Sequence, residues 1–217
     1  MGKNYKMNNA GFSLVELIVS VLITGVLMLA VSMFLASSRN TFQTVNTSAT
    51  LQEESMTTER ILNEYILEAK KYGLDKNVSI SGVSTDVFWV LAGENEGTSE
   101  DDVAYIFVLD KDKKVLRYCR GTEADVEPSS GKLTAGGIGT VKTRCFGSNE
   151  KYSLIANYVE SMKCTPVNRP DGTDLVCLEI KYEFMGKTYT DNLTSVTRNK
   201  TGVTSVSGVP AESGGGT

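Results

Sequence analysis

The chain begins with a polar stretch and then becomes continuously apolar. Between Glu16 and Arg39 lie 22 residues without a charge or a proline. At about 1.5 Å rise per residue, a helix of that length spans roughly 33 Å, which matches the hydrocarbon core of a bilayer. A secretory signal typically has an apolar core of only about 7–15 residues. The pattern therefore predicts a membrane-spanning helix.

The helical periodicity continues beyond Arg39, although the sequence becomes more polar. Two groups of apolar residues follow at helical spacing: Phe42, Val45, Ala49 and Met56, then Leu62, Tyr65, Ile66, Ala69 and Tyr72. Lys70 and Lys71, followed by Gly73, are typical of a helix end. We therefore expect one helix from 12 to 72 whose second half packs against a sheet.

The rest of the chain alternates between strand-like segments and turns. The strand-like segments are 87–93, 103–109, 115–119, 153–167, 173–184 and 187–197. Residues 121–150 are rich in Gly, Ser and Thr and are expected to be irregular, including the AGGIGT stretch. The pattern predicts an α+β fold, with a long N-terminal helix packed on an antiparallel β-sheet domain.

Composition narrows the classes of function. The formal net charge is −4 and the chain has no run of basic residues, so no nucleic-acid partner is predicted. Histidine is absent, which removes the commonest general base and metal ligand. Glu179 and Glu183 would share one strand face, but nothing else converges on them. We therefore predict no enzyme, no cofactor and no metal site.

The cysteines all follow the apolar segment and form no CxxC pair: Cys119, Cys145, Cys164 and Cys177. An even number in an exported domain favours disulfides, with buried free thiols as the alternative. A hairpin centred on the 170–171 peptide bond would place Cys164 opposite Cys177, because their numbers sum to 341. We therefore expect this pair, which leaves Cys119 with Cys145, although four cysteines allow three connectivities.

The stretch GFSLVEL at 11–17 resembles the processing site of type IV prepilins and of the pseudopilins of type II secretion. In that family a membrane peptidase cuts after the glycine and methylates the new N-terminal amine. The resemblance implies cleavage between Gly11 and Phe12, an N-methylated Phe12, and Glu16 as the acid four residues beyond it. Gly25 also falls where many family members have a glycine.

The carboxylate of Glu16 needs a partner in an apolar environment. Cleavage would create an ammonium at Phe12, and each of the two charges alone would carry a large desolvation cost. Glu16 can neutralise this ammonium within the subunit or on a neighbour in a filament, where pairing would also set the axial register. The alternative is an interfacial glutamate whose side chain merely reaches the headgroups.

The resemblance also implies a division of the chain. The expected parts are a cleaved leader at 1–11, a transmembrane and filament-core helix at 12–38, an amphipathic half at 39–72, an extracytoplasmic β domain at 73–199 and a flexible tail at 200–217. The basic residues of the leader, Lys3 and Lys6, keep the N-terminus in the cytoplasm by the positive-inside rule. The chain would thus be a single-pass cytoplasmic-membrane protein and then part of an extracellular filament.

The function implied is that of a structural subunit of a type IV pilus-like filament. Its partners would be other pilin subunits, the prepilin peptidase, the inner-membrane assembly platform and, before assembly, the membrane. Met33 stands where many major pilins have a proline, which favours a minor pilin. The alternatives are a pseudopilin of a secretion or DNA-uptake system and an uncleaved single-pass anchor carrying a binding or sensor domain.

Overall fold

The computed structural model describes residues 13–93, 102–147, 153–168 and 174–197. The predicted leader, the cleavage position at Gly11 and Phe12, the 170–171 turn and the predicted tail lie outside these residues. The chain divides into two compact units, Met1–Asn46 and Thr47–Thr217.

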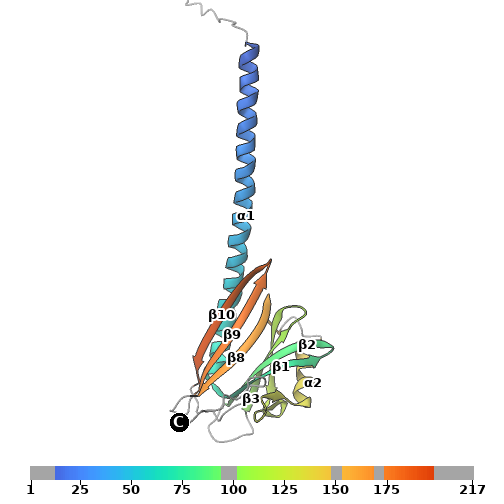
Figure 1. The fold of residues 1–217 in the computed structure, drawn as a ribbon. Helices are drawn as coiled ribbons and strands as arrows, with labels where there is room; N and C mark the ends of the chain where they lie inside the picture. The colour runs from blue at the N-terminus through green and yellow to red at the C-terminus, as the bar shows by residue number, and fades with distance from the viewer. Residues whose placement is uncertain (1–12, 94–101, 148–152, 169–173, 198–217) are drawn as a thin grey trace, which may run out of the picture. The chain divides into compact units, whose positions relative to one another are not determined.

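The first unit contributes the N-terminal part of helix α1, which runs from Leu14 to Leu67 (Figure 1). All its large apolar side chains from Leu14 to Leu35 are exposed. By length and composition, α1 qualifies as a membrane-spanning helix. The predicted apolar helix is therefore present, and its apolar side chains are not buried in a hydrophobic core within this unit.

The helix ends at Leu67, so the predicted end at residue 72 is wrong. Residues Ala69–Ile80 form strand β1 instead. Tyr72 is buried in the sheet, and a Cβ at Gly73 would lie 2.5 Å from the Trp89 ring. Gly73 thus allows β1 to pack beside the indole and does not end a helix, because tertiary packing outweighs local helix propensity here.

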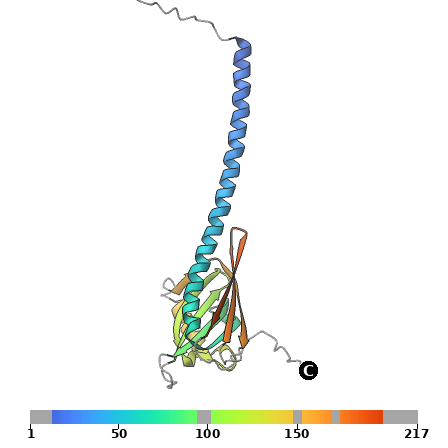
Figure 2. The same cartoon turned by 90° about the vertical axis from the view of Figure 1, so that its left-hand side faces the viewer.

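The strands of the second unit form two main antiparallel sheets. The first has the order β1-β2-β3-β4-β7, with β2 at Val83–Gly93, β3 at Asp102–Asp110, β4 at Val115–Thr122 and β7 at Leu154–Ala156. The second has the order β10-β9-β8, with β8 at Val159–Asn168, β9 at Asp174–Phe184 and β10 at Lys187–Val196. Figures 1 and 2 show these last three strands side by side, in orange and red. The α+β, pilin-like layout predicted from the sequence is confirmed.

The segment 121–150, expected to be irregular, contains regular structure where it is described. It holds a 3-10 turn, η2 at Glu123–Asp125, a two-stranded ribbon of β5 at Val126–Glu127 and β6 at Lys132–Leu133, and helix α2 at Ala135–Cys145. The Thr134 hydroxyl accepts a hydrogen bond from the Gly137 amide at 3.1 Å and caps α2. The AGGIGT stretch is therefore the first half of a helix and not a loop.

The five-stranded sheet carries a hydrophobic core on each face. On one face its side chains join those of α1 and of the second sheet, including Leu62, Ile66, Phe88, Phe107, Leu116 and Leu178. On the other face they pack against α2, including Trp89, Ile106, Val108, Cys119, Val141 and Cys145. The alternation follows from the pleat, because successive residues of a strand point to opposite faces. In the second unit this sheet thus lies between α1 and α2.

Of the two apolar groups predicted on α1, the second packs against the sheet: Leu62 and Ile66 are buried, and Tyr65 is partly so. The first group is exposed: Phe42 is 72%, Val45 62% and Met56 69% exposed. The buried positions before residue 60 are instead Thr47, Leu51, Ser55 and Thr58. These positions recur every three or four residues, so they share one helix face although most of them are polar.

Candidate functional site

The start of α1 is organised by Ser13. Its backbone carbonyl accepts hydrogen bonds from the amides of Glu16 at 3.0 Å and Leu17 at 3.2 Å. Its hydroxyl accepts one from the Val15 amide at 3.3 Å. Ser13 is therefore the N-cap of the helix. The order Ser-x-x-Glu at residues 13–16 is itself a helix-start signal in the sequence, and it predicts this N-cap.

Glu16 lies in the first turn of α1, and its side chain is exposed. The free amide groups and the dipole at a helix N-terminus favour an anion in this position. Among the residues that the structure describes, none forms a salt bridge with Glu16. The predicted partner, the amine of Phe12, lies outside those residues, so the pairing stays a prediction.

Three hydroxyl groups inside the apolar half of α1, those of Ser20, Thr24 and Ser32, are satisfied by their own helix. The Ser20 hydroxyl donates to the Glu16 carbonyl. Thr24 donates to the Ser20 carbonyl at 2.7 Å, and Ser32 to the Met28 carbonyl at 2.8 Å. An unsatisfied hydroxyl would be costly in hydrocarbon, so these bonds make the segment compatible with lipid.

Gly25 lies in this same apolar segment. A Cβ built on it meets no atom within 4 Å. Nothing in the described chain therefore requires a glycine here, although glycine costs about 1 kcal/mol relative to alanine inside a helix. A small residue in a lipid-exposed helix lets a second helix approach closely.

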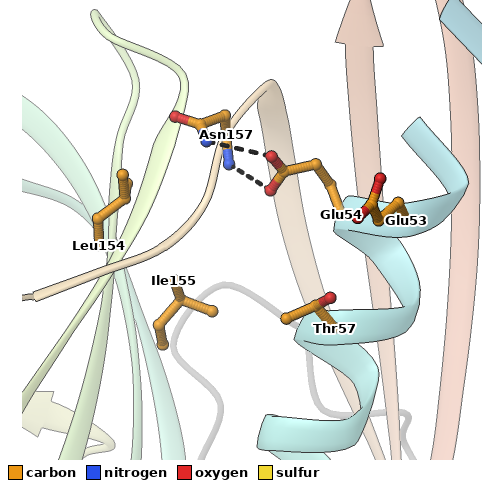
Figure 3. Close-up of a pocket in the computed structure, with 6 residues that line it drawn as sticks. All are labelled: Glu53, Glu54, Thr57, Leu154, Ile155 and Asn157. Atoms are coloured by element: carbon orange, nitrogen blue, oxygen red, sulfur yellow. Dashed lines mark hydrogen bonds between the residues drawn. The ribbon is translucent and has the colours of Figure 1, made fainter. Parts of the chain in front are cut away.

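An open cavity of about 230 Å³ lies beside α1 in the second unit (Figure 3). Its lining residues are Glu53, Glu54, Thr57, Leu154, Ile155 and Asn157. The Glu54 carboxylate accepts hydrogen bonds from the Asn157 backbone amide at 2.9 Å and from its side-chain amide at 3.1 Å. The polar groups of Glu54 and Asn157 thus bond to each other rather than to a ligand, and they attach the segment after β7 to α1. We therefore assign this cavity a structural role.

The predicted register of the β8–β9 hairpin is wrong by one residue. Cys164 lies opposite Leu178, and Cys177 lies opposite Thr165. Cys164 is buried in the core, whereas Cys177 is partly exposed on the other face of the sheet. Because adjacent positions point to opposite faces, the geometric basis for a Cys164–Cys177 disulfide is lost.

Cys119 and Cys145 are brought together by the fold. Cys119 lies on β4, Cys145 ends α2, and both side chains are buried in the core between them. The structure holds all four cysteines as thiols. A hydrogen bond from Cys145 lowers the pKa of the Cys119 thiol, and the same bond, together with burial, raises the pKa of Cys145.

Comparison with known proteins identifies the N-terminal segment. Residues 6–32 match the family model described as the prokaryotic N-terminal methylation motif. No curated protein and no solved structure matches the chain. The motif is the prepilin-type signal for cleavage and methylation, so the resemblance seen in the sequence is confirmed. The signal, the long apolar helix and the antiparallel β domain together support a type IV pilin-like or pseudopilin-like subunit.

Proposed function

We propose that this chain is a minor pilin, a structural subunit of a type IV pilus-like filament. The apolar half of α1 holds the precursor in the cytoplasmic membrane, with the leader inside and the β domain outside. The prepilin peptidase cuts between Gly11 and Phe12 and methylates the new amine. The assembly platform then transfers the subunit from the membrane into the filament, where it packs against other pilin subunits.

The observation that carries this proposal is the combination of the matched motif with the exposed carboxylate of Glu16 at the start of α1. The helix N-terminus favours the charge only partly, at about 0.3–1 kcal/mol near a surface. In an apolar surrounding that contribution is too small to offset the desolvation of a carboxylate. An amine at Phe12, in the same subunit or a neighbour, supplies the missing positive charge.

The exposed apolar surface of α1 supports polymerisation. Side chains from Leu14 to Leu35 are exposed without interruption by a charge other than Glu16. Such a surface is stable in lipid or against other apolar helices but not in water. In the membrane it contacts acyl chains, and in a filament it contacts the corresponding helices of neighbouring subunits. Gly25, which its own fold does not require, provides a point of close helix approach.

The N-terminus of the native protein tests this proposal directly. Intact-mass analysis of protein extracted from native membranes should show loss of residues 1–11 and one added methyl group on Phe12. Cleavage should persist in Gly11→Ala and fail in Gly11→Leu, because a bulky residue does not fit a site that accepts glycine. A wild-type chain that keeps Lys3 and Lys6 would contradict the proposal and favour an uncleaved membrane anchor.

A pseudopilin is the second candidate. Helix α1, Leu14–Leu67, contains no proline, and this feature fits a pseudopilin as well as it fits a minor pilin. Antibody labelling of intact cells separates the two. A minor pilin should be detected in surface filaments, and its deletion should change their number or length. If no surface filament is labelled and deletion abolishes export of a secreted protein, the pseudopilin is the correct assignment.

A further inference from the structure

Two buried thiols meet at the interface between β4 and α2. Cys119 is 5% exposed on the face of β4 that packs against α2, and Cys145, the last residue of α2, is 0% exposed. The two thiols lie close enough for each to shift the pKa of the other. Both belong to the core that contains Trp89, Ile106 and Val141, so apolar packing surrounds the pair.

The neighbours of each cysteine hold the two chain segments in register. The Arg144 guanidinium, next to Cys145, donates to the carbonyl of Arg120, next to Cys119. On the other side, the Arg117 guanidinium lies 6.0 Å from the centre of the Phe146 ring, within reach of a cation–π contact. Each of these two contacts joins a residue near Cys119 to a residue next to Cys145. Together they hold β4 and the end of α2 side by side on both sides of the cysteine pair.

The remaining cysteines have a different environment. Cys164 is buried in the other core, on the far side of the five-stranded sheet. Burial, and secondarily the nearby Cys177, raise the pKa of the Cys164 thiol to about 12. Cys177 lies opposite Thr165 and Thr194 on the outer face of the second sheet. Neither is placed to bond with Cys119 or Cys145.

We propose that Cys119 and Cys145 form a disulfide that fastens α2 to β4, while Cys164 and Cys177 remain thiols. The inference rests on the proposed function, because only an extracytoplasmic domain meets an oxidising environment. The oxidant is a disulfide-bearing thiol oxidase of that compartment. The bond closes a covalent loop that contains η2, β5, β6 and α2. It therefore restricts the motion of the part of the domain that has the shortest strands.

The chemistry is a two-step thiol–disulfide exchange. The Cys119 thiol loses its proton and attacks one sulfur of the oxidant's disulfide, which forms a mixed disulfide and releases the oxidant's other sulfur as a thiolate. Cys145 then loses its proton and attacks the Cys119 sulfur, which forms the new S–S bond and releases the oxidant's remaining sulfur. The oxidant becomes a dithiol by accepting two electrons and two protons. The lowered pKa of Cys119 suits it as the first nucleophile.

Counting thiols in the native full-length protein tests the proposal. Cells are treated with iodoacetamide before lysis, and the protein is extracted in detergent and denatured in fresh iodoacetamide, so that buried thiols are alkylated as well. One half is then reduced and alkylated again, and both halves are digested. Two alkylated cysteines, Cys164 and Cys177, are expected without reduction, and four with it. A peptide that joins Cys119 to Cys145 should appear only in the unreduced digest. Four alkylated cysteines before reduction, or a cross-link that includes Cys164 or Cys177, would overturn the proposal.

Matched variants add a second readout. A Cys119→Ser, Cys145→Ser double variant should lose roughly 10 °C in Tm, and reductant should not lower it further. Cys177→Ser, on the outer face, should keep the wild-type Tm and its sensitivity to reductant. A double variant as stable as the wild type would contradict the proposal.

The same mass spectra report the N-terminus and therefore separate this proposal from the proposed function. A chain that has lost residues 1–11 but carries four thiols overturns the disulfide alone. A chain that keeps its leader but contains the Cys119–Cys145 link overturns the pilin assignment alone.

Discussion

At the scale of single residues, Gly137 determines whether α2 can dock. A Cβ at this position would lie 2.0 Å from the backbone carbonyl oxygen of Asp125, an atom that cannot move without displacing η2. That carbonyl also accepts the Thr134 amide at 3.0 Å, and the Asp125 side chain accepts the Thr140 hydroxyl at 3.0 Å. The close approach of α2 to η2 is therefore stabilised by hydrogen bonds on both sides of the glycine.

We expect Gly137→Ala to reduce the free energy of unfolding by about 1–3 kcal/mol, because the methyl group forces α2 and η2 apart. Gly139→Ala is the matched control in the same helix, since a Cβ there meets nothing within 4 Å. It should raise stability by about 0.5–1 kcal/mol, through helix propensity alone. Thermal unfolding of the detergent-extracted chain measures both. Equal effects in the two variants would show that the contact with Asp125 does not matter.

At the scale of secondary structure, α1 contributes to the β domain through a narrow buried face. Leu62→Ala should destabilise the domain by about 2–4 kcal/mol, because Leu62 is fully buried in the core between the helix and the sheets. Met56→Ala, at a position 69% exposed, should stay within about 0.5 kcal/mol of the wild type. Chemical denaturation of the extracted protein compares them. A loss for Met56→Ala as large as that for Leu62→Ala would contradict the assigned face.

The elements that the sequence predicted well are those whose pattern is local. The apolar helix and the strand-like segments that correspond to β3, β4, β9 and β10 follow from periodicity and from the turns between them. The buried face of α1 was not predictable in the same way, because Thr47, Ser55 and Thr58 are polar. Ser55 is buried since its hydroxyl donates to the Asp191 carboxylate at 2.5 Å, a partner 136 positions away in the chain.

The register behind the predicted Cys164–Cys177 pair is wrong for a similar reason. Asn168 pairs with Asp174, so five residues separate the paired ends, and the numbers of opposed residues sum to 342. The prediction assumed a two-residue centre and a sum of 341. One residue of shift moves a side chain to the other face of a strand. The sequence paired Cys119 with Cys145 only by elimination. The structure places both in the core between β4 and α2, a helix whose glycines predicted a loop.

At the scale of the whole molecule, we propose that Glu16 links processing to assembly. In the precursor its charge can remain at the membrane surface, but in a filament core it needs the ammonium created by cleavage. Removing one member of a buried ion pair typically costs about 3–5 kcal/mol, because the other charge is left uncompensated. Glu16→Gln should therefore leave the subunit fully able to insert and to be cleaved, and impair only its incorporation into filaments.

The measurement is the ratio of subunit in sheared surface filaments to subunit in the membrane, with N-terminal mass recorded for both fractions. We expect at least a tenfold fall in this ratio for Glu16→Gln, as the energy above implies. Glu59→Gln, an exposed position of α1 in the β-domain unit, removes one negative charge without removing a predicted pair and should leave the ratio unchanged. If the two variants assemble equally well, Glu16 does not neutralise the N-terminus. If Glu16→Gln lowers the ratio but the precursor also accumulates uncleaved, the carboxylate acts in recognition by the peptidase, before assembly begins.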